Sequence, residues 1–206
     1  MSNHTHLLVH ALKALMEETN GIIKENQAEK AQNTIQACAI TAAASGVGAS
    51  IFPGPGGLVL AAVAVGAVWV MYAKINKDLG ISIKDNVLKS LASAVLSNIL
   101  ANAGALLLAF VAAAIIGFIP GLNFLVAPAQ AMIAYLAVFA AAIIYINLLR
   151  KLFKANGAFV LTEDEGAKMA KEIVEETDMN AMFKEIKKSY DDNKDEIKKA
   201  KDSGAK

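Results

Sequence analysis

The side chains best suited to bind a metal ion are three histidines close to the start of this chain of 206 residues. His6 and His10 lie four residues apart, so on a helix they share one face, a spacing that can hold zinc. The acid of an H-E-x-x-H motif is missing, and the single cysteine, Cys38, is distant in sequence. Because no base stands beside Cys38, we expect neither a metal site nor a reactive thiol.

Two glycine-rich stretches, residues 46–50 and 53–57, have the composition of loops that cradle phosphate. Neither leads into the Gly-Lys-Ser or Gly-Lys-Thr of a phosphate-binding loop, and no serine lies in a G-x-S-x-G elbow. The 20 Lys and Arg residues nearly balance the 19 Asp and Glu residues, which disfavours binding to nucleic acid. We therefore expect a protein that is not an enzyme, uses no cofactor and binds no nucleic acid.

Charged residues are absent from two long stretches of the chain. No Asp, Glu, Lys, Arg or His occurs from Ala31 to Ala73, or from Ser90 to Leu149. A soluble helical core does not need such stretches, because each of its helices also faces water. A bilayer does, since one charge at its centre costs roughly 2.5 kcal/mol or more. The sequence therefore predicts an integral membrane protein, with the lipid bilayer as its first partner.

Each neutral stretch predicts a helical hairpin that reverses at a Pro-Gly sequence, because proline ends a helix and glycine permits a tight turn. The bounds and turn residues are 35–73 with Pro53 and Gly54, and 87–149 with Pro120 and Gly121. A hydrocarbon core of ~30 Å needs about 20 helical residues per crossing. We therefore expect an all-α integral membrane protein with about four membrane helices.

With four crossings, every charged segment falls on one side of the membrane. The lysines and arginine next to the neutral stretches are Lys24, Lys30, Lys74, Lys77, Lys84, Lys89, Arg150, Lys151 and Lys154. Short loops rich in Lys and Arg mark the cytoplasmic side, so we expect both termini in the cytoplasm and the protein in the cell membrane. Hairpins that dip into one leaflet fit the same charge map. Crossing is favoured, because turns at membrane depth would need partners for their backbone groups.

Polar segments flank the expected membrane domain, which spans residues 35–154. Residues 1–34 have the pattern of an amphipathic helix that is interrupted at Asn20-Gly21. Residues 155–206 have ordinary soluble composition and form the third segment.

Two helices are expected in this C-terminal tail. Thr162 and Glu165 form a capping box ahead of the first, and the second starts near Asp178. Met182, Phe183, Ile186 and Tyr190 share one face of the second helix. Residues 191–206 have mixed charge, and we expect a solvated or frayed end there.

Small residues and amides inside the neutral stretches are the candidate packing positions, because small residues let helices approach closely in lipid and buried amides need partners. The residues singled out are Ala42, Gly46, Ser50, Ser97, Asn98, Asn102, Gly104 and Gln130. They either pack the hairpins together within one chain or line an interface between copies or a polar pore. A homo-oligomer is therefore one of the expected partners.

The order of motifs in residues 35–152 resembles a known family. An Ala-rich helix ends in Phe52-Pro53-Gly54, a linking segment reads KINKDLGI at residues 74–81, and a long Ala/Ser helix leads to residues 118–122, FIPGL. This pattern is similar to the hydrophobic domain of unknown function that accompanies bacterial Era-like small GTPases. The resemblance implies a membrane-associated helical domain that serves a GTPase. Since this chain shows no GTPase motifs, that partner would be a separate protein.

From these observations we expect a non-enzymatic membrane anchor or scaffold for a cytoplasmic protein, with a small GTPase as the candidate partner. The alternative is an oligomeric pore or pore-forming effector, for which Ser97, Asn98 and Asn102 supply a polar stripe on one helix.

Overall fold

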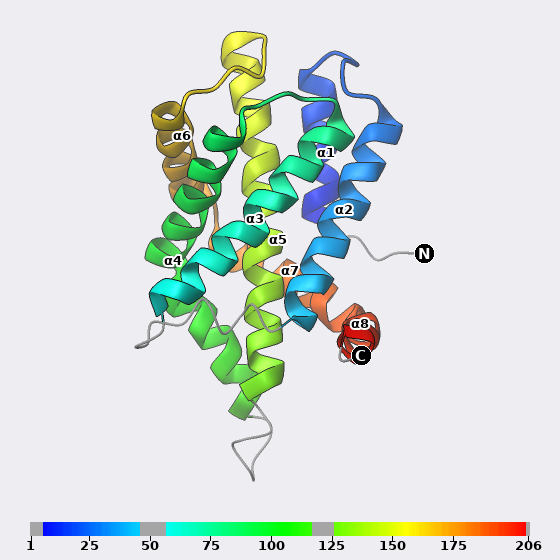
Figure 1. Ribbon diagram of the computed structural model, residues 1–206, viewed down its shortest axis with the longest axis vertical. Helices are drawn as coiled ribbons and strands as arrows, with labels where there is room; N and C mark the ends of the chain where they lie inside the picture. Colours follow the sequence, from blue (N-terminus) through cyan, green and yellow to red (C-terminus); the bar gives the residue numbers. More distant parts are fainter. Residues whose placement is uncertain (1–5, 46–56, 117–125, 205–206) are drawn as a thin grey trace.

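The computed structural model describes residues 6–45, 57–116 and 126–204, a part of the chain that contains helices and no strands (Figure 1). The helices are α1 (His6–Glu18), α2 (Glu25–Ala44), α3 (Gly57–Leu79), α4 (Asp85–Ile116), α5 (Val126–Asn156), α6 (Glu163–Glu176), α7 (Met179–Asp192) and α8 (Lys194–Gly204). The all-α prediction is confirmed. The expected turn residues Pro53, Gly54, Pro120 and Gly121 lie outside the described residues.

Helix α5 runs through the middle of the bundle and is contacted by α1, α2, α3, α4, α6 and α7 (Figure 1). Every residue from Met132 to Ile146 is buried. This follows from the sequence of α5, since a helix that is apolar on all sides must be covered on all sides. Here the cover is protein, which comes from both ends of the chain.

Two helical stretches, Asp85–Leu106 and Gln130–Asn156, are long and apolar enough to cross a membrane. They differ in cover, because 44% of the apolar window of the first and 94% of that of the second are buried inside the protein. Both belong to the second expected hairpin. The central helix of a soluble bundle has the same length and composition, so four membrane helices remain a prediction.

The expected interruption at Asn20-Gly21 is confirmed. The backbone φ angles there are +48° and +80°, in the left-handed region that ends a helix. Thr19 donates its hydroxyl to the carbonyl of Leu15 at 2.9 Å and satisfies the last turn of α1. The chain then reverses, and α2 continues past residue 34, where the sequence suggested the edge of the membrane domain.

Both predicted starts in the C-terminal tail are confirmed. The backbone N–H of Glu165 donates to the Thr162 hydroxyl at 3.3 Å, and the N–H of Thr162 donates to the Glu165 carboxylate at 3.0 Å. At the next helix, the N–H of Ala181 donates to the Asp178 carboxylate at 3.0 Å. The apolar face predicted for that helix is buried, and it contacts α5.

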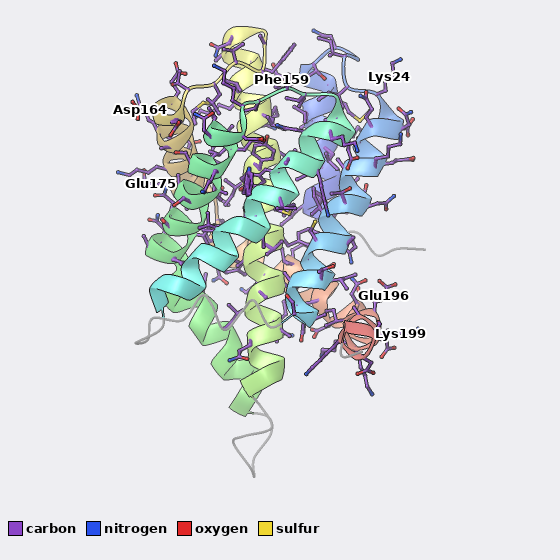
Figure 2. The ribbon with its side chains drawn as sticks, viewed as in Figure 1. Lys24, Phe159, Asp164, Glu175, Glu196 and Lys199 are labelled. Carbon is purple, nitrogen blue, oxygen red and sulfur yellow. The ribbon has the colours of Figure 1, made fainter. Side chains whose placement is uncertain are left out.

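The expectation of a frayed end is wrong for residues 194–204, which form α8 against α2, whereas most side chains of this segment are exposed, as expected for a solvated end. Ile197 is the buried apolar side chain of α8, at 7% exposure, whereas Glu196 and Lys199 point outward (Figure 2). An ion pair of 2.8 Å between Lys194 and Asp191 links the start of α8 to the end of α7. One buried apolar side chain in a highly charged segment is a signal too short to detect as a periodic pattern.

Helix α6 approaches α4 closely at Gly166. A Cβ atom at this glycine would lie 3.2 Å from Leu161 and 3.5 Å from Leu91, so a larger side chain would push the two helices apart. The start of α6 is also tied to α4 by a hydrogen bond of 2.6 Å from the Asn86 amide to the Glu163 carboxylate. The outer side chains of α6, such as Asp164 and Glu175, face away from the bundle (Figure 2).

Candidate functional site

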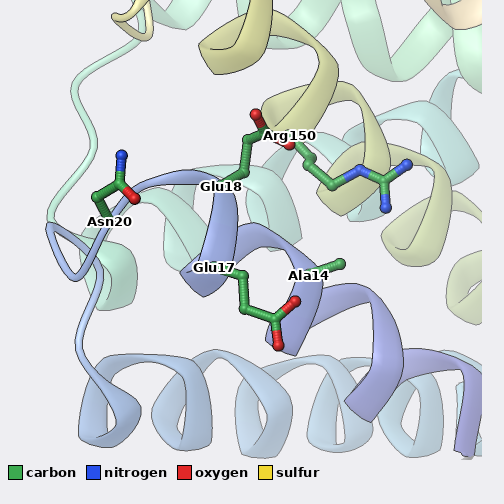
Figure 3. Close-up of a pocket in the computed structure, with 5 residues that line it drawn as sticks. All are labelled: Ala14, Glu17, Glu18, Asn20 and Arg150. Atoms are coloured by element: carbon green, nitrogen blue, oxygen red, sulfur yellow. The ribbon is translucent and has the colours of Figure 1, made fainter.

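A polar hollow of about 370 Å³ lies where the end of α1 meets α5, between Glu17, Glu18, Asn20 and Arg150 (Figure 3). No ion pair joins Arg150 to either glutamate in the described structure. The hollow has no nucleophile, and His6 and His10 are both exposed elsewhere on α1. Within the described residues no three His, Cys, Asp or Glu side chains gather as metal ligands.

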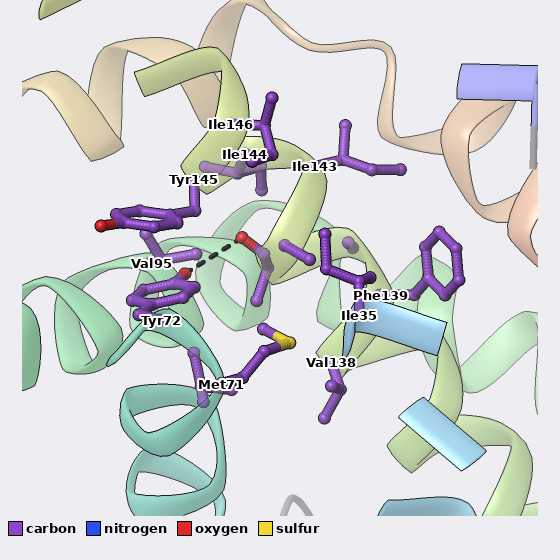
Figure 4. Packing of buried hydrophobic residues seen from close by; sticks show 14 of the residues in the cluster. Ile35, Met71, Tyr72, Val95, Val138, Phe139, Ile143, Ile144, Tyr145 and Ile146 are labelled. Atoms are coloured by element: carbon purple, nitrogen blue, oxygen red, sulfur yellow. Dashed lines mark hydrogen bonds between the residues drawn. The ribbon is translucent and has the colours of Figure 1, made fainter. Parts of the chain in front are cut away.

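Two tyrosines form a polar contact inside the apolar core, between α3 and α5 (Figure 4). Tyr72 and Tyr145 stack with ring centroids 4.0 Å apart. Tyr72 donates its hydroxyl to the carbonyl of Ala141 at 3.0 Å, and Tyr145 donates to Oδ1 of Asn76 at 2.5 Å. The Nδ2 group of Asn76 is buried without a partner. These bonds fix the register of α3 on α5, because a buried polar group left unpaired is costly.

A second polar contact joins α2, α5 and α7 at Tyr135. Its hydroxyl donates to Oε1 of Gln36 at 3.3 Å and lies 2.9 Å from the hydroxyl of Ser189. Asn193 donates to the carbonyl of Ser189 at 2.6 Å, and the ring of Tyr190 meets that of Tyr135 edge-on. Three parts of the chain that are far apart in sequence therefore meet at one buried hydroxyl.

The place of Tyr135 along α5 matters for any membrane role. It precedes Arg150 by 15 residues, or about 22 Å at the helical rise. Helix α7, which carries many charges, thus lies beside the neutral stretch of α5, well away from its charged end, and α8 packs against α2 and α7. The C-terminal tail also contacts the charged end of α5, where Lys151 donates to the Glu172 carboxylate at 2.9 Å. This contact lowers the pKa of Glu172.

The candidate packing residues are dispersed in the structure, which brings only Asn98 and Asn102 together. The Asn98 amide donates to the carbonyl of Ala94 at 2.8 Å, and the Asn102 amide donates to that of Asn98 at 2.9 Å. Both bonds lie within α4, as expected for a side chain that bonds its own helix. Ala42 is buried in α2, whereas Gly104 and Gln130 are partly exposed. Gly46 and Ser50 lie outside the described residues.

One face of α4 is uncovered and carries small or polar side chains together with one large apolar one, Leu100. The exposed residues on it are Ser93, Ser97, Leu100, Ala101, Asn102 and Ala105. This face contains part of the predicted polar stripe, and no other described helix covers it.

A groove of about 460 Å³ lies between α2 and α3. Small and apolar residues make up most of its lining, namely Ala37, Cys38, Ala42, Gly66, Ala67 and Val70. Hydroxyls from Thr34, Thr41 and Ser45 line its α2 side, and Lys74 is its one charged lining residue. Sequence reasoning missed both this groove and the tyrosine contacts. The signal for the latter was the presence of Gln36, Tyr72 and Tyr135 inside charge-free stretches, where a polar group needs a partner.

The arrangement in the described residues is thus a buried apolar helix with polar contacts to its neighbours, an uncovered polar face on α4 and an apolar groove with one lysine. It lacks the paired acid and base, or nucleophile and base, that hydrolytic chemistry uses. No protein-family model, curated protein or solved structure matches this chain.

Proposed function

We propose that the protein is a non-enzymatic membrane anchor or scaffold. In this proposal the α4–α5 hairpin enters the bilayer with its charge-free end first. The amphipathic helices at the two ends of the chain bind a partner protein on the cytoplasmic side. The observation that carries it is that α4 and α5 extend beyond all other described helices at one end of the bundle (Figure 1). That end belongs to the neutral stretch 90–149.

The depth of entry can be worked from the helix lengths. Helix α5 extends nine residues beyond Tyr135, or about 14 Å, and α4 extends fourteen residues beyond Asn102, or about 21 Å. Half of a ~30 Å hydrocarbon core is about 15 Å. The hairpin therefore reaches roughly through one leaflet while α7 and α8 stay in place.

A complete crossing needs a further step. The charged side chains of α7 would have to leave the side of α5, and those of α8 the side of α2, because each charge costs roughly 2.5 kcal/mol or more at the bilayer centre. Lipid would then replace α7 around α5. Dipping and crossing are therefore two states of one anchor, which differ in the position of the tail.

The cytoplasmic side is assigned by the basic residues near the opposite end of the neutral stretches, including Lys74, Lys84, Arg150 and Lys154. We place the protein in the bacterial inner membrane with both termini in the cytoplasm. The candidate partner is a small GTPase, which rests on the family resemblance of residues 35–152. Purification in a mild detergent tests this part, and recovery of no bound protein with or without residues 155–206 would contradict it.

The decisive experiment labels single cysteines in intact cells. Gly54, Gly121 and Ser203 are each replaced by Cys in a Cys38→Ala background, and a membrane-impermeant maleimide is added from outside. Labelling at Gly121 with Ser203 protected supports crossing. Protection of both, with Gly121 reactive only toward a lipid-soluble maleimide in the membrane fraction, supports dipping. If all variants fractionate with soluble protein, the anchor is refuted.

An oligomeric pore is the second candidate, favoured by the uncovered face of α4 with Ser97 and Asn102. Planar-bilayer conductance tests it. Asn98→Leu and Asn102→Leu are suitable variants, because both amides bond their own helix and their loss breaks no contact between helices. A pore lined by this face should lose most of its conductance in Asn102→Leu, because Asn102 is exposed on it, and less in Asn98→Leu, because Asn98 is only half-exposed beside it. An unchanged conductance would show that this face does not line the pore.

A further inference from the structure

The groove between α2 and α3 has the polarity of a site for a single-chain amphiphile. Its exposed lining is mainly apolar, and Lys74, from the last two turns of α3, is the only charged residue that lines it among the residues the structure describes. The opposite end of the groove is bounded by Ser45 and Gly66, which are small. Its volume of about 460 Å³ is towards the small end of the range for small-molecule sites.

The charge at the Lys74 end is available to a ligand. Lys74 is exposed and makes no ion pair with any carboxylate in the described residues. Asp78, one turn further along α3, does not line the groove, but its carboxylate accepts the hydroxyl of Thr34, which does line it, at 2.5 Å. A ligand with one anionic group and a long neutral body therefore matches both parts of the groove.

The groove is also open at Gly66, because this residue has no side chain to fill it. Gly66 lines it, and a Cβ atom placed on Gly66 would meet no atom within 4 Å. Eight residues separate Gly66 from Lys74, so the groove extends for about 12 Å along α3. This length without charge excludes a compact polar ligand.

We infer that the α2–α3 groove binds a medium-chain fatty acid, with the carboxylate at Lys74 and the acyl chain along the small residues toward Gly66. A single chain fits better than a two-chain phospholipid, because there is one groove and one lysine. The inference is independent of the proposed membrane anchor, since the groove is formed by the folded bundle itself.

The single cysteine allows a direct test on the full-length purified protein, because Cys38 lines the groove. The rate of Cys38 alkylation by a maleimide is measured with dodecanoate, kept below its micellar concentration, and with dodecanol. Dodecanoate should protect Cys38 at lower concentrations than dodecanol. Each further methylene that the groove buries should tighten binding about fourfold, so decanoate should bind more weakly.

Matched variants locate the two ends of the ligand. Lys74→Gln should weaken the binding of dodecanoate about two- to fivefold, as for a partly exposed ion pair, whereas Lys77→Gln on the same helix should not. Gly66→Leu should abolish protection by filling the groove. Gly104→Leu is its control, because that position on α4 is equally open and lies outside the groove.

The inference would be overturned by equal protection by dodecanol and dodecanoate, by equal effects of the two lysine variants, or by full protection in a folded Gly66→Leu variant. Circular dichroism establishes whether that variant is folded, and Ala67→Val replaces it if it is not. Protection by phosphatidylglycerol vesicles alone, without any effect of dodecanoate, would assign the groove to a membrane phospholipid and also refute the fatty acid. Failure of the protein to bind vesicles would refute the anchor and leave this measurement unaffected.

Discussion

Replacing Tyr145 by Phe removes one hydroxyl from the core and tests whether water is excluded from the contact between Tyr145 and Asn76. Tyr145 supplies the only hydrogen bond found for the buried side chain of Asn76, which is 4% exposed. Phe keeps the stack on Tyr72 but leaves both polar atoms of Asn76 unpaired. We expect a loss of about 1–3 kcal/mol in the free energy of unfolding, and a Tm lower by about 3–9 °C for a chain of this size.

The companion variants make this prediction sharp. In the double variant Tyr145→Phe with Asn76→Leu, both partners become apolar, so stability should return to within about 1 kcal/mol of the original protein. Tyr72→Phe is the control and should cost less, because its acceptor is a backbone carbonyl inside α5. Denaturation is followed by circular dichroism in one fixed buffer or detergent. The free-energy losses of Tyr145→Phe and of Asn76→Leu are also measured separately. If these two losses simply add in the double variant, water or lipid reaches this contact and the reasoning is refuted.

Three further predictions concern the tail. Thr162→Ala should destabilise α6 by about 1 kcal/mol through loss of its cap, seen as faster hydrogen exchange in α6 but not in α7. Acid should release the tail. Lys151 lowers the pKa of Glu172 below its ordinary 4.5, so this contact stabilises the fold above that pH and is lost as the pH falls through the lowered pKa. Burial raises the pKa of Asp191, but its bonds to Lys187 and Lys194 outweigh this and give a net lowering, with the same sign. Proteolysis of the tail should therefore increase between pH 5 and pH 3, and an unchanged rate would contradict the role of these pairs. Gly166→Leu should cost about 1–3 kcal/mol by forcing α6 off α4, measured by urea denaturation, whereas Gly104→Leu should not.

The parts of the fold that could be predicted are those with local causes. Thr162 and Asp178 mark helix starts because their side chains accept bonds from N–H groups three residues on. Asn20-Gly21 marks a break because these two residues tolerate positive φ. Each of these signals lies within four residues of sequence and is independent of the rest of the chain.

The cover around α5 could not be predicted, because an apolar helix is satisfied equally by lipid and by protein side chains. The choice depends on the faces of α6, α7 and α8, whose apolar stripes are short and whose docking positions have no local signal. Tyr135 shows the difficulty, since its partners Gln36 and Ser189 are 99 and 54 residues away. The groove was missed for a related reason. Ala42 predicts close packing in lipid, and the structure leaves space beside it.

The meeting of α2, α5 and α7 at Tyr135 has a consequence for synthesis of the chain. Ser189 follows Tyr135 by 54 residues, so at about 5–20 residues per second the ribosome delivers it roughly 3–10 s later. During that interval α5 exists without its C-terminal cover. In the proposed anchor, a nascent chain at a membrane would therefore place its apolar hairpin in lipid before the competing helices have been made, whereas a chain released into water would complete the bundle first. Under that proposal, the order of synthesis and the location of the ribosome would select between the two environments.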